Sequence, residues 1–285
     1  MRTYLDCYPC FLTQALRAAR AVGAAEGVQR RLLLEVMSLL AGLEEEVPPP
    51  VIGRAVHRRL RELLSSEDPY RELKASATRR ALELLPALRR RIERTGRPFA
   101  AAVALSAAAN TIDLAVDEGY RQQELEQRLE AAFNQALPGE AVGRLEQAVA
   151  AAERIVFLAD NAGELVLDRP LLELLGREKT TVVVRGGPAI NDAVRADAEA
   201  AGLEGFALAD TGDDAPGVIP ADAGAELRAL LAGADLVIAK GQGNFEGLSG
   251  EKLPLFFLLK AKCPVIARHI GCAVGELLVL DRRSG

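Results

Sequence analysis

Three short segments of the chain place polar side chains among glycines directly after runs of apolar residues. They are LADNAGE at 158–164, RGGPAINDA at 185–193 and KGQGNFEG at 240–247. The preceding runs, at 154–159, 180–184 and 235–239, have the β-branched and apolar character of buried strands. In an open parallel sheet the carboxyl ends of the strands meet at one crevice, where ligands bind. We therefore expect the three segments to build a single oxygen-rich pocket.

The acidic and amide side chains of the first two segments are candidate ligands for a metal ion. Asp160 and Asn161 offer a carboxylate and an amide oxygen side by side, and Glu164 follows in the first turn of a predicted helix. Asn191 and Asp192 follow the second strand, again in the predicted first turn of a helix. Hard divalent cations prefer such oxygens. Helix capping alone would explain any one of these residues, but two carboxylates on neighbouring strands repel each other unless a cation lies between them.

Positive charge and glycine follow the fourth strand. Lys240 comes directly after the apolar run DLVIA, so we expect its ammonium group at the rim of the pocket. Gly241 and Gly243 would allow backbone N–H groups to approach phosphate oxygens closely. Lys260 and Lys262 precede the predicted fifth strand and could add positive charge, although an isolated lysine pair is more often a solvated face.

Other common sites are missing from the sequence or ambiguous in it. The chain has no Walker phosphate loop, no G-x-G-x-x-G after the first strand and no G-x-S-x-G elbow. Neither of the two histidines has the spacing of a metal ligand. Cys7 and Cys10 form a C-x-x-C that fits a redox pair, two small buried residues, or half of a zinc site. In the zinc case the spacing of Cys263 and Cys272 is wrong for the second half.

Composition limits the class of protein. The chain has 285 residues, of which 49% are hydrophobic and 26% charged, which is ample for a core. No apolar stretch reaches the ~18–20 residues of a membrane span, and the N-terminus MRTYLDCYPC lacks a signal peptide's apolar region. We therefore expect a cytoplasmic protein with no membrane partner. The net charge of −5 and the absence of Trp argue against a nucleic-acid partner.

The sequence changes character near residue 150. Before this point apolar residues recur with helical spacing, which predicts helices at 51–65, 69–85, 98–116, 121–136 and 138–152. After it, strands at 154–159, 180–185, 204–209, 235–239, 264–268 and 276–280 alternate with helices at 163–176, 188–201, 222–232 and 251–261. Such alternation predicts a parallel sheet covered on both faces. We expect an all-helical N-terminal domain over 1–150 and a Rossmann-like α/β/α domain with a mainly parallel sheet over 151–285.

Taken together, the motifs resemble those of the DUF89 family of metal-dependent damage-control phosphatases. The resemblance also rests on LDCYPCFLTQAL, DPYRELK and AANTIDLA in the N-terminal part and on TGDDAPG and LLKAKCPVIA in the C-terminal part. It is greatest with the prokaryotic branch that carries the N-terminal C-x-x-C. The chain departs from the family at 109–110, where it reads Ala-Asn and the family often reads Gly-Asn.

The resemblance implies hydrolysis of phosphate monoesters of small phosphorylated metabolites. These would be damaged or normal compounds such as sugar phosphates or phosphopantetheine-like molecules, with Mn²⁺, Co²⁺ or Ni²⁺ as cofactor and Mg²⁺ also compatible. By motif, the metal ligands fall on Asp160, Asn161 and Asp192. The substrate contacts implied by the family fall on the third segment and its surroundings, namely Glu164, Lys240, Gly241, Asn244 and Lys262.

Our leading hypothesis is therefore a metal-dependent phosphatase in which Asp160, Asp192 and Lys262 are catalytic. The nucleophile is either water or the carboxylate of Asp160, and we favour water. Two alternatives remain open at this stage, an S-adenosylmethionine-dependent methyltransferase and a non-catalytic binding protein. We expect specificity to lie in the helical portion that roofs the pocket, including Asp68, Tyr70, Lys74, Asn110 and Asp113. The sequence of the chain does not predict an oligomeric state.

Overall fold

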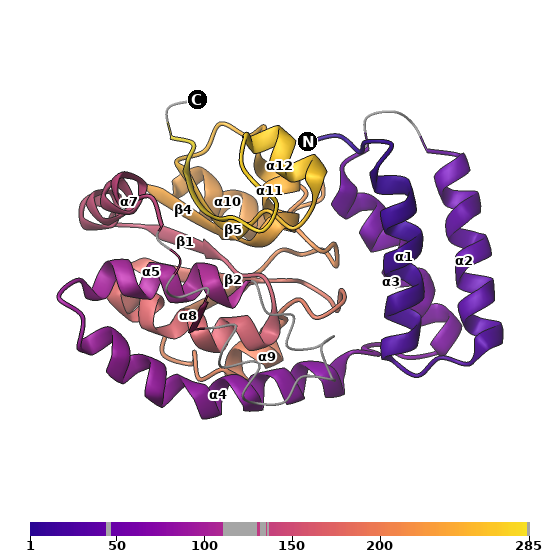
Figure 1. Ribbon diagram of the computed structural model, residues 1–285, viewed down its shortest axis with the longest axis horizontal. Coiled ribbons are helices and arrows are strands. Elements are labelled where there is room, and N and C mark those ends of the chain that lie inside the picture. Colours follow the sequence, from indigo (N-terminus) through magenta and orange to yellow (C-terminus); the bar gives the residue numbers. More distant parts are fainter. Residues whose placement is uncertain (44–46, 111–129, 132–134, 136, 284–285) are drawn as a thin grey trace.

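A six-stranded sheet forms the centre of the protein (Figure 1). The computed structural model describes residues 1–43, 47–110, 130–131, 135 and 137–283. The strands are β1 Ile155–Leu158, β2 Thr180–Val184, β3 Ala207–Asp210, β4 Leu236–Lys240, β5 Leu255–Lys260 and β6 Leu277–Asp281. Their order is β3-β2-β1-β4-β5-β6, with every pairing parallel except the antiparallel pair β5–β6. This confirms the predicted α/β fold with a mainly parallel sheet.

Both faces of the sheet are covered by helices because successive strand residues point to opposite sides. In β1, Ile155 and Phe157 join one hydrophobic cluster, whereas Val156 and Leu158 join another. The first cluster draws on α4 Arg71–Glu93, α5 Pro98–Ala109, α7 Gly139–Ala151, α8 Ala162–Leu175 and α9 Arg195–Ala200. The second draws on α10 Ala225–Gly233, α11 Gly241–Leu248 and α12 Pro264–Ile270. Strands buried on both faces read as continuous apolar runs, which is what the sequence contains.

The first three helices form a separate bundle at one end of the molecule (Figure 1). These are α1 Cys7–Ala21, α2 Glu26–Ala41 and α3 Pro49–Leu64, and their apolar faces share a hydrophobic cluster of their own. The helix α4 leaves this bundle and runs beneath the α/β part, packing on α8. The cluster on that face of the sheet includes residues on both sides of position 150. The apolar faces of α1–α3 thus form a cluster distinct from the two that cover the sheet. The predicted domain division at 1–150 and 151–285 stays a prediction.

Two elements predicted near the C-terminus were wrong. The predicted helix 251–261 contains β5, and the predicted strand 264–268 lies in α12. Leu255, Phe256, Phe257, Leu258 and Leu259 are all buried, and an apolar run of this length does not distinguish a strand from a buried helix by periodicity. Pro264 occupies the first turn of α12, where its missing N–H is not needed.

The polar segments also differ locally from prediction. The predicted helix 188–201 is helical only over α9, so residues 188–194 form a connection that contains Asn191 and Asp192. Conversely, α11 covers the glycine-containing segment 241–248, for which no helix was predicted. The predicted helix 98–116 is helical over α5, and its remainder and most of the predicted helix 121–136 lie outside the described residues.

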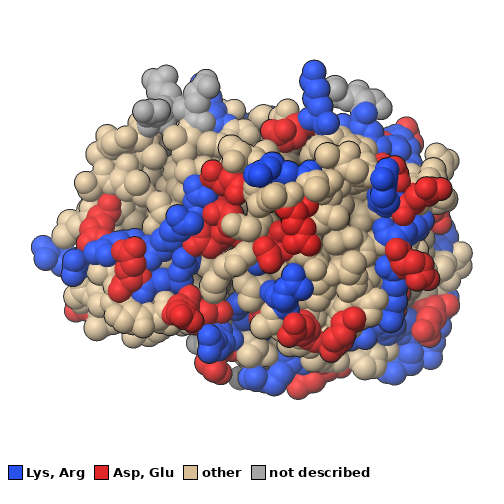
Figure 2. All heavy atoms as spheres, turned by 180° about the vertical axis from the view of Figure 1, so that it is seen from behind, with Lys and Arg blue, Asp and Glu red and all other residues tan. Residues whose placement is uncertain are grey.

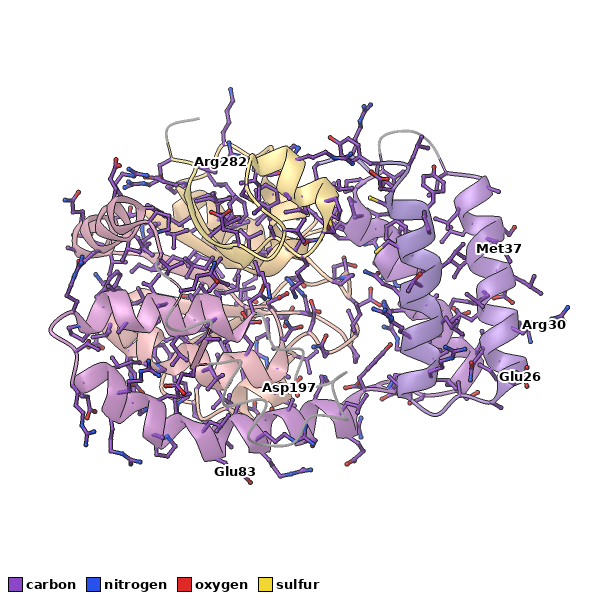
Figure 3. The ribbon with its side chains drawn as sticks, viewed as in Figure 1. Glu26, Arg30, Met37, Glu83, Asp197 and Arg282 are labelled. Carbon is purple, nitrogen blue, oxygen red and sulfur yellow. The ribbon has the colours of Figure 1, made fainter. Side chains whose placement is uncertain are left out.

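Charged side chains of both signs are interspersed over the face shown in Figure 2, which views the molecule from behind. Ion pairs of the described residues include those of Arg89 with Glu173 and of Arg144 with Glu140. Met37 of α2 is exposed and points away from the rest of the molecule (Figure 3). Among the helices of the described residues, none combines the length and the apolar character needed to cross a membrane.

Candidate metal and phosphate site

The three polar segments meet at the carboxyl ends of β1, β2 and β4. The strand order β3-β2-β1-β4-β5-β6 reverses between β1 and β4, and ligands of open α/β sheets usually bind in the crevice at such a point. An isolated antiparallel bridge joins Asn161 to Asp192. From the third segment, Gly241 lies so close that a Cβ atom on it would be 2.0 Å from Asp160 Oδ2. The structure therefore brings the predicted segments together.

Backbone hydrogen bonds hold the two acidic segments side by side. The N–H of Ala162 donates to the carbonyl of Asn191 at 2.9 Å, and the N–H of Ala193 donates to the carbonyl of Asp160 at 2.8 Å. Their carboxylates are largely buried, with Asp160 8% and Asp192 4% exposed. Two carboxylates are thus fixed close together by the main chain rather than by flexible side-chain contacts.

Helix capping does not account for these residues. Asn161 stands at the N-cap of α8, but its side chain makes no capping hydrogen bond. Asp192 was predicted in the first turn of a helix, and this was wrong because α9 begins only at Arg195. Its carboxylate instead accepts a hydrogen bond from a buried arginine, Arg185. Helix capping therefore does not explain the presence of Asn161 or of Asp192.

Two amide side chains fix the orientation of the Asp160 carboxylate. Asn110 Nδ2 donates to Asp160 Oδ2 at 2.7 Å and to Glu164 Oε2 at 2.9 Å. Asn161 Nδ2 donates to the same two oxygens, at 3.1 Å each. Because the oxygen and nitrogen of an amide point in different directions, Asn161 turns its Oδ1 away from these carboxylates. The second oxygen of Asp160, Oδ1, has Arg185 Nη2 at 3.7 Å.

Sequence reasoning missed the arginine at the centre of this site. Arg185 is only 2% exposed, and its Nε donates to Asp192 Oδ2 at 2.6 Å. Its Nη1 donates to Asn244 Oδ1 at 2.9 Å. One guanidinium therefore offsets part of the repulsion between Asp160 and Asp192. The available signal was a charged residue directly after a buried strand, in the motif RGGP.

The positive charges near Asp160 and Asp192 do not offset the effects that disfavour their ionised forms. Burial, with the nearby charges of Glu164 and Asp192, raises the pKa of Asp160 to about 7. Burial also raises the pKa of Asp192, despite the ion pair with Arg185. Carboxylates with a pKa raised by burial and by like charges are typical of functional sites. An added cation would favour their ionised forms.

Lys240 does not emerge at the rim of the pocket, so that expectation was wrong. The side chain is fully buried, and its Nζ donates to Glu164 Oε1 at 2.6 Å, to Asp168 Oδ1 at 2.5 Å and to the carbonyl of Ser106 at 3.0 Å. These contacts use the three protons of the ammonium group. Burial raises the pKa of Asp168 to about 6 even with Lys240 beside it. Lys240 is thus part of an internal charge network, and Asp168 and Ser106 are members that the sequence did not reveal.

The remaining predicted contacts differ in their exposure. Asn244 is fully buried, and its Nδ2 donates to the carbonyls of Ala159 at 3.1 Å and Lys240 at 2.8 Å. It braces strand ends and does not face an opening. Lys262 is exposed, directly after β5, and its charge counteracts the raised pKa of Asp160 and Asp192. The backbone at Gly241, with φ +78°, lies against Asp160 at the N-terminus of α11.

The described residues contain no group of three His, Cys, Asp or Glu side chains arranged to hold a metal ion. The zinc interpretation of Cys7 and Cys10 therefore has no support within this part of the chain. The candidate centre is of a different kind, because one of its three predicted ligands is the amide of Asn161. Among the predicted roof residues, Asn110 contacts the site and Asp113 lies outside the described residues.

Comparisons with known proteins match the whole of this architecture. The family model for the damage-control phosphatase ARMT1-like domain matches residues 3–278. A damage-control phosphatase of Archaeoglobus fulgidus is 35% identical over 282 residues, covering 95% of this chain and 96% of that protein. A damage-control phosphatase of Pyrococcus horikoshii is 31% identical and covers 99% of both chains. The crystal structure of a DUF89 family protein from Pyrococcus horikoshii matches with a TM-score of 0.88, at 30% identity and 99% coverage of each chain.

Proposed function

This chain belongs to the damage-control phosphatase ARMT1-like family, and we propose that it hydrolyses phosphate monoesters of small metabolites at a divalent metal ion. Family membership supports a phosphatase. It also favours this activity over the two alternatives, methyl transfer and non-catalytic binding. The proposed substrates are small phosphorylated metabolites, damaged or not, such as sugar phosphates and phosphopantetheine-like compounds.

The observation that carries the proposal is the backbone bridge between Asn161 and Asp192. It fixes two buried carboxylates, those of Asp160 and Asp192, beside each other although the pKa of each is raised. Holding like charges together costs stability, and such an arrangement is typical of a site that receives a cation. The backbone N–H groups at the start of α11 and the exposed Lys262 lie next to it and supply donors for an anion.

The side chains present fit a hard or borderline divalent cation. Asp160, Asn161 and Asp192 would hold it through oxygen atoms, which suits Mg²⁺ and Mn²⁺ and is compatible with Co²⁺ and Ni²⁺. When bound, such an ion offsets charge on phosphoryl oxygens and lowers the pKa of a water molecule. A catalytic role for Asp160 and Asp192 follows from holding the ion.

The protein's own residues orient the reactants. Arg185 holds the Asp192 carboxylate through its Nε, and Asn110 holds Oδ2 of Asp160. Lys262 would bind phosphate oxygens as a compact point charge, which we propose as its catalytic contribution. Because Asp160 would serve as a ligand of the ion, we propose water rather than this carboxylate as the nucleophile.

The proposal is tested with purified protein that has been treated with EDTA and then supplied with Mn²⁺, Co²⁺, Ni²⁺ or Mg²⁺. Hydrolysis of p-nitrophenyl phosphate, sugar phosphates and phosphopantetheine should appear only with added metal. The variant Asp192→Ala should lose both Mn²⁺ binding and turnover while keeping the circular dichroism spectrum of the wild type. Equal turnover with and without EDTA, or full activity of Asp192→Ala, would contradict the proposed centre.

A further inference from the structure

The segment that carries Asp192 contains a residue in a strained backbone conformation. Ile190 has φ +45°, in the left-handed region. A β-branched residue is a genuine outlier there because its side chain clashes with the backbone. Such a conformation persists only where the surrounding structure imposes it, and functional sites are where these outliers gather. Something must therefore hold Ile190, two residues before the proposed metal ligand.

The bundle α1–α3 makes one of the contacts that hold this residue. The partly buried Ile190 side chain packs against the hydrophobic cluster that α1–α3 form together with Tyr70 at the start of α4. That cluster includes Phe11, Val36, Ile52 and Leu60, from all three helices. A residue of the segment that carries Asp192 thus packs against the hydrophobic cluster of the bundle.

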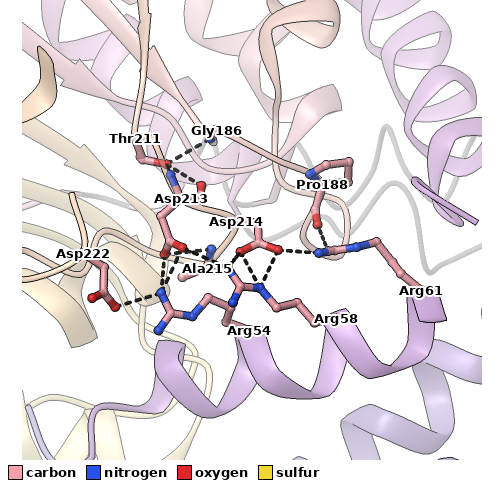
Figure 4. Close-up of polar contacts among 10 residues, drawn as sticks. All are labelled: Arg54, Arg58, Arg61, Gly186, Pro188, Thr211, Asp213, Asp214, Ala215 and Asp222. Atoms are coloured by element: carbon pink, nitrogen blue, oxygen red, sulfur yellow. Dashed lines mark hydrogen bonds and ion pairs between the residues drawn. The ribbon is translucent and has the colours of Figure 1, made fainter. Parts of the chain in front are cut away.

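A second contact comes from the arginine face of α3. Arg54, Arg58 and Arg61 lie along one side of this helix and face the connection after β3 (Figure 4). Arg61 Nη1 donates to the carbonyl of Pro188, and its Nη2 pairs with Asp214 Oδ2. The Arg61 side chain is mostly buried, at 19% exposure, so this contact is shielded from water.

The connection after β3, residues 211–224, also contacts the start of the segment 185–193. The N–H of Gly186 donates to the carbonyl of Asp213 at 2.9 Å and to Thr211 Oγ1 at 3.0 Å. A Cβ atom on Gly186 would lie 2.7 Å from the backbone nitrogen of Asp213, so the two stretches of backbone are in direct contact. The start of the segment therefore packs on the connection after β3, and the arginines of α3 hold Asp213 and Asp214 of that connection.

The far end of the segment is held by a different element. Lys74 of α4, which is almost fully buried, pairs with Asp197 Oδ2 at 2.8 Å. The same oxygen accepts a hydrogen bond from the N–H of Val194 at 2.9 Å. Asp197 lies on α9, on the side next to α4 (Figure 3). The contacts of α3 and the cluster thus fall on Pro188 and Ile190, whereas Lys74 of α4 acts on residue 194 through Asp197.

We propose that the α1–α3 bundle positions the Asp192 carboxylate by holding residues 188–190, with Ile190 and Arg61 as positioning residues. The inference about metal affinity rests on the proposed function. It assigns the bundle a role in the geometry of the centre, in addition to any role in covering the pocket. Loss of either contact releases the strain at Ile190, and the bridge between Asn161 and Asp192 then loosens.

The chain offers a matched pair of variants for the test. Arg58 and Arg61 both pair with Asp214 from the same face of α3, but only Arg61 also contacts Pro188 (Figure 4). In metal-free protein, hydrogen exchange in peptides covering residues 186–193 should be faster in Arg61→Ala and unchanged in Arg58→Ala. The dissociation constant for Mn²⁺, measured by calorimetry, should rise about tenfold or more in Arg61→Ala and stay within about twofold in Arg58→Ala.

Two further variants separate positioning from general stability. Ile190→Ala keeps the Cβ atom and removes the packing, so it should act in the same direction as Arg61→Ala and replaces it if that variant fails to fold. Arg61→Lys keeps one donor for the carbonyl of Pro188 and should restore part of the Mn²⁺ affinity. Equal unfolding midpoints for Arg58→Ala and Arg61→Ala would show that the local effect is not a global one.

The outcomes distinguish this inference from the proposed function. Equal exchange in Arg58→Ala and Arg61→Ala, or no change at 186–193 in Arg61→Ala and Ile190→Ala, would overturn the positioning role. If wild-type protein binds no Mn²⁺ while Arg61→Ala still accelerates exchange at 186–193, the hold of the bundle on this segment is supported and the proposed metal centre fails.

Discussion

Replacement of Asp160 by Asn should stabilise the metal-free protein while abolishing metal binding. The folded-state pKa of Asp160 is raised from 3.8 to about 7, first by burial and then by Glu164 and Asp192. A carboxylate with a raised pKa contributes full stability below pH 4, and this contribution is lost as the pH rises through 7. Asn keeps the size and an oxygen that can accept from Asn110, but it carries no charge at any pH.

The size of the effect follows from the shift. About 3 pKa units at about 1.4 kcal/mol each give roughly 4 kcal/mol as an upper limit on the free energy of unfolding lost above pH 7. Arg185 and Lys262 act in the opposite sense and are contained in that shift. The variant and the wild type should therefore be similar near pH 4 and differ increasingly up to pH 8.

Urea unfolding of EDTA-treated protein at pH 4.5, 6 and 8 measures this difference. Asp214→Asn is the opposite control, because Arg58 and Arg61 outweigh burial and hold the pKa of Asp214 at about 2, so that removing its charge should destabilise at pH 8. Added Mn²⁺ should stabilise the wild type and leave Asp160→Asn unchanged. A wild type that is more stable than Asp160→Asn at pH 8 without metal would refute the electrostatic reasoning.

Three other changes test separate parts of the site. Lys240→Met should destabilise the protein by about 3–5 kcal/mol in urea at pH 7, because two buried carboxylates lose their cation, and by less at pH 5, below the pKa of Asp168 at about 6. Gly241→Ala should lose Mn²⁺ binding in calorimetry, since its Cβ would lie 2.0 Å from Asp160 Oδ2, whereas Gly250→Ala, with nothing within 4 Å, should bind normally. Lys262→Ala should raise KM about tenfold or more for a phosphate monoester with an unchanged unfolding midpoint; an unchanged KM would remove Lys262 from the phosphate site.

Strands β1, β2 and β4 could be predicted because the residue types within each strand indicate that it is buried. The runs at β1, β2 and β4 are apolar and β-branched and each ends abruptly in polar residues and glycine, so both the strand and its functional end are visible locally. The family match confirms the resemblance drawn from the same motifs. The exchange of helix and strand around β5 and α12 arose where an apolar run lacked period, and where Pro264 could begin a helix or interrupt a strand.

The internal charges could not be predicted, because they depend on contacts between distant segments. Lys240 follows a strand just as a pocket residue would, and its burial results from Ser106 on α5 and Asp168 on α8. Arg185 pairs with Asp192 only because residues 188–194 turn back on the strand end instead of forming a helix. Secondary-structure propensity and residue spacing predict neither the burial of Lys240 nor the pairing of Arg185 with Asp192.

Charge balance supports the proposed position of the cation, beside Asp160 and Asp192 rather than beside Lys240. In this region the part of the chain that the structure describes has four buried carboxylates, Asp160, Glu164, Asp168 and Asp192, and two buried cations, Arg185 and Lys240. With every group ionised this leaves two negative charges, which one divalent ion would neutralise. Lys240 shares its protons between Glu164 and Asp168, each at most 1% exposed, so that pair is closed. Among the described residues, Asp160 and Asp192 share the buried cation Arg185, retain slight exposure and lie within the influence of the exposed Lys262. The second pair is therefore the one at which we propose the ion, and the strained segment before Asp192 would position one of its two carboxylates.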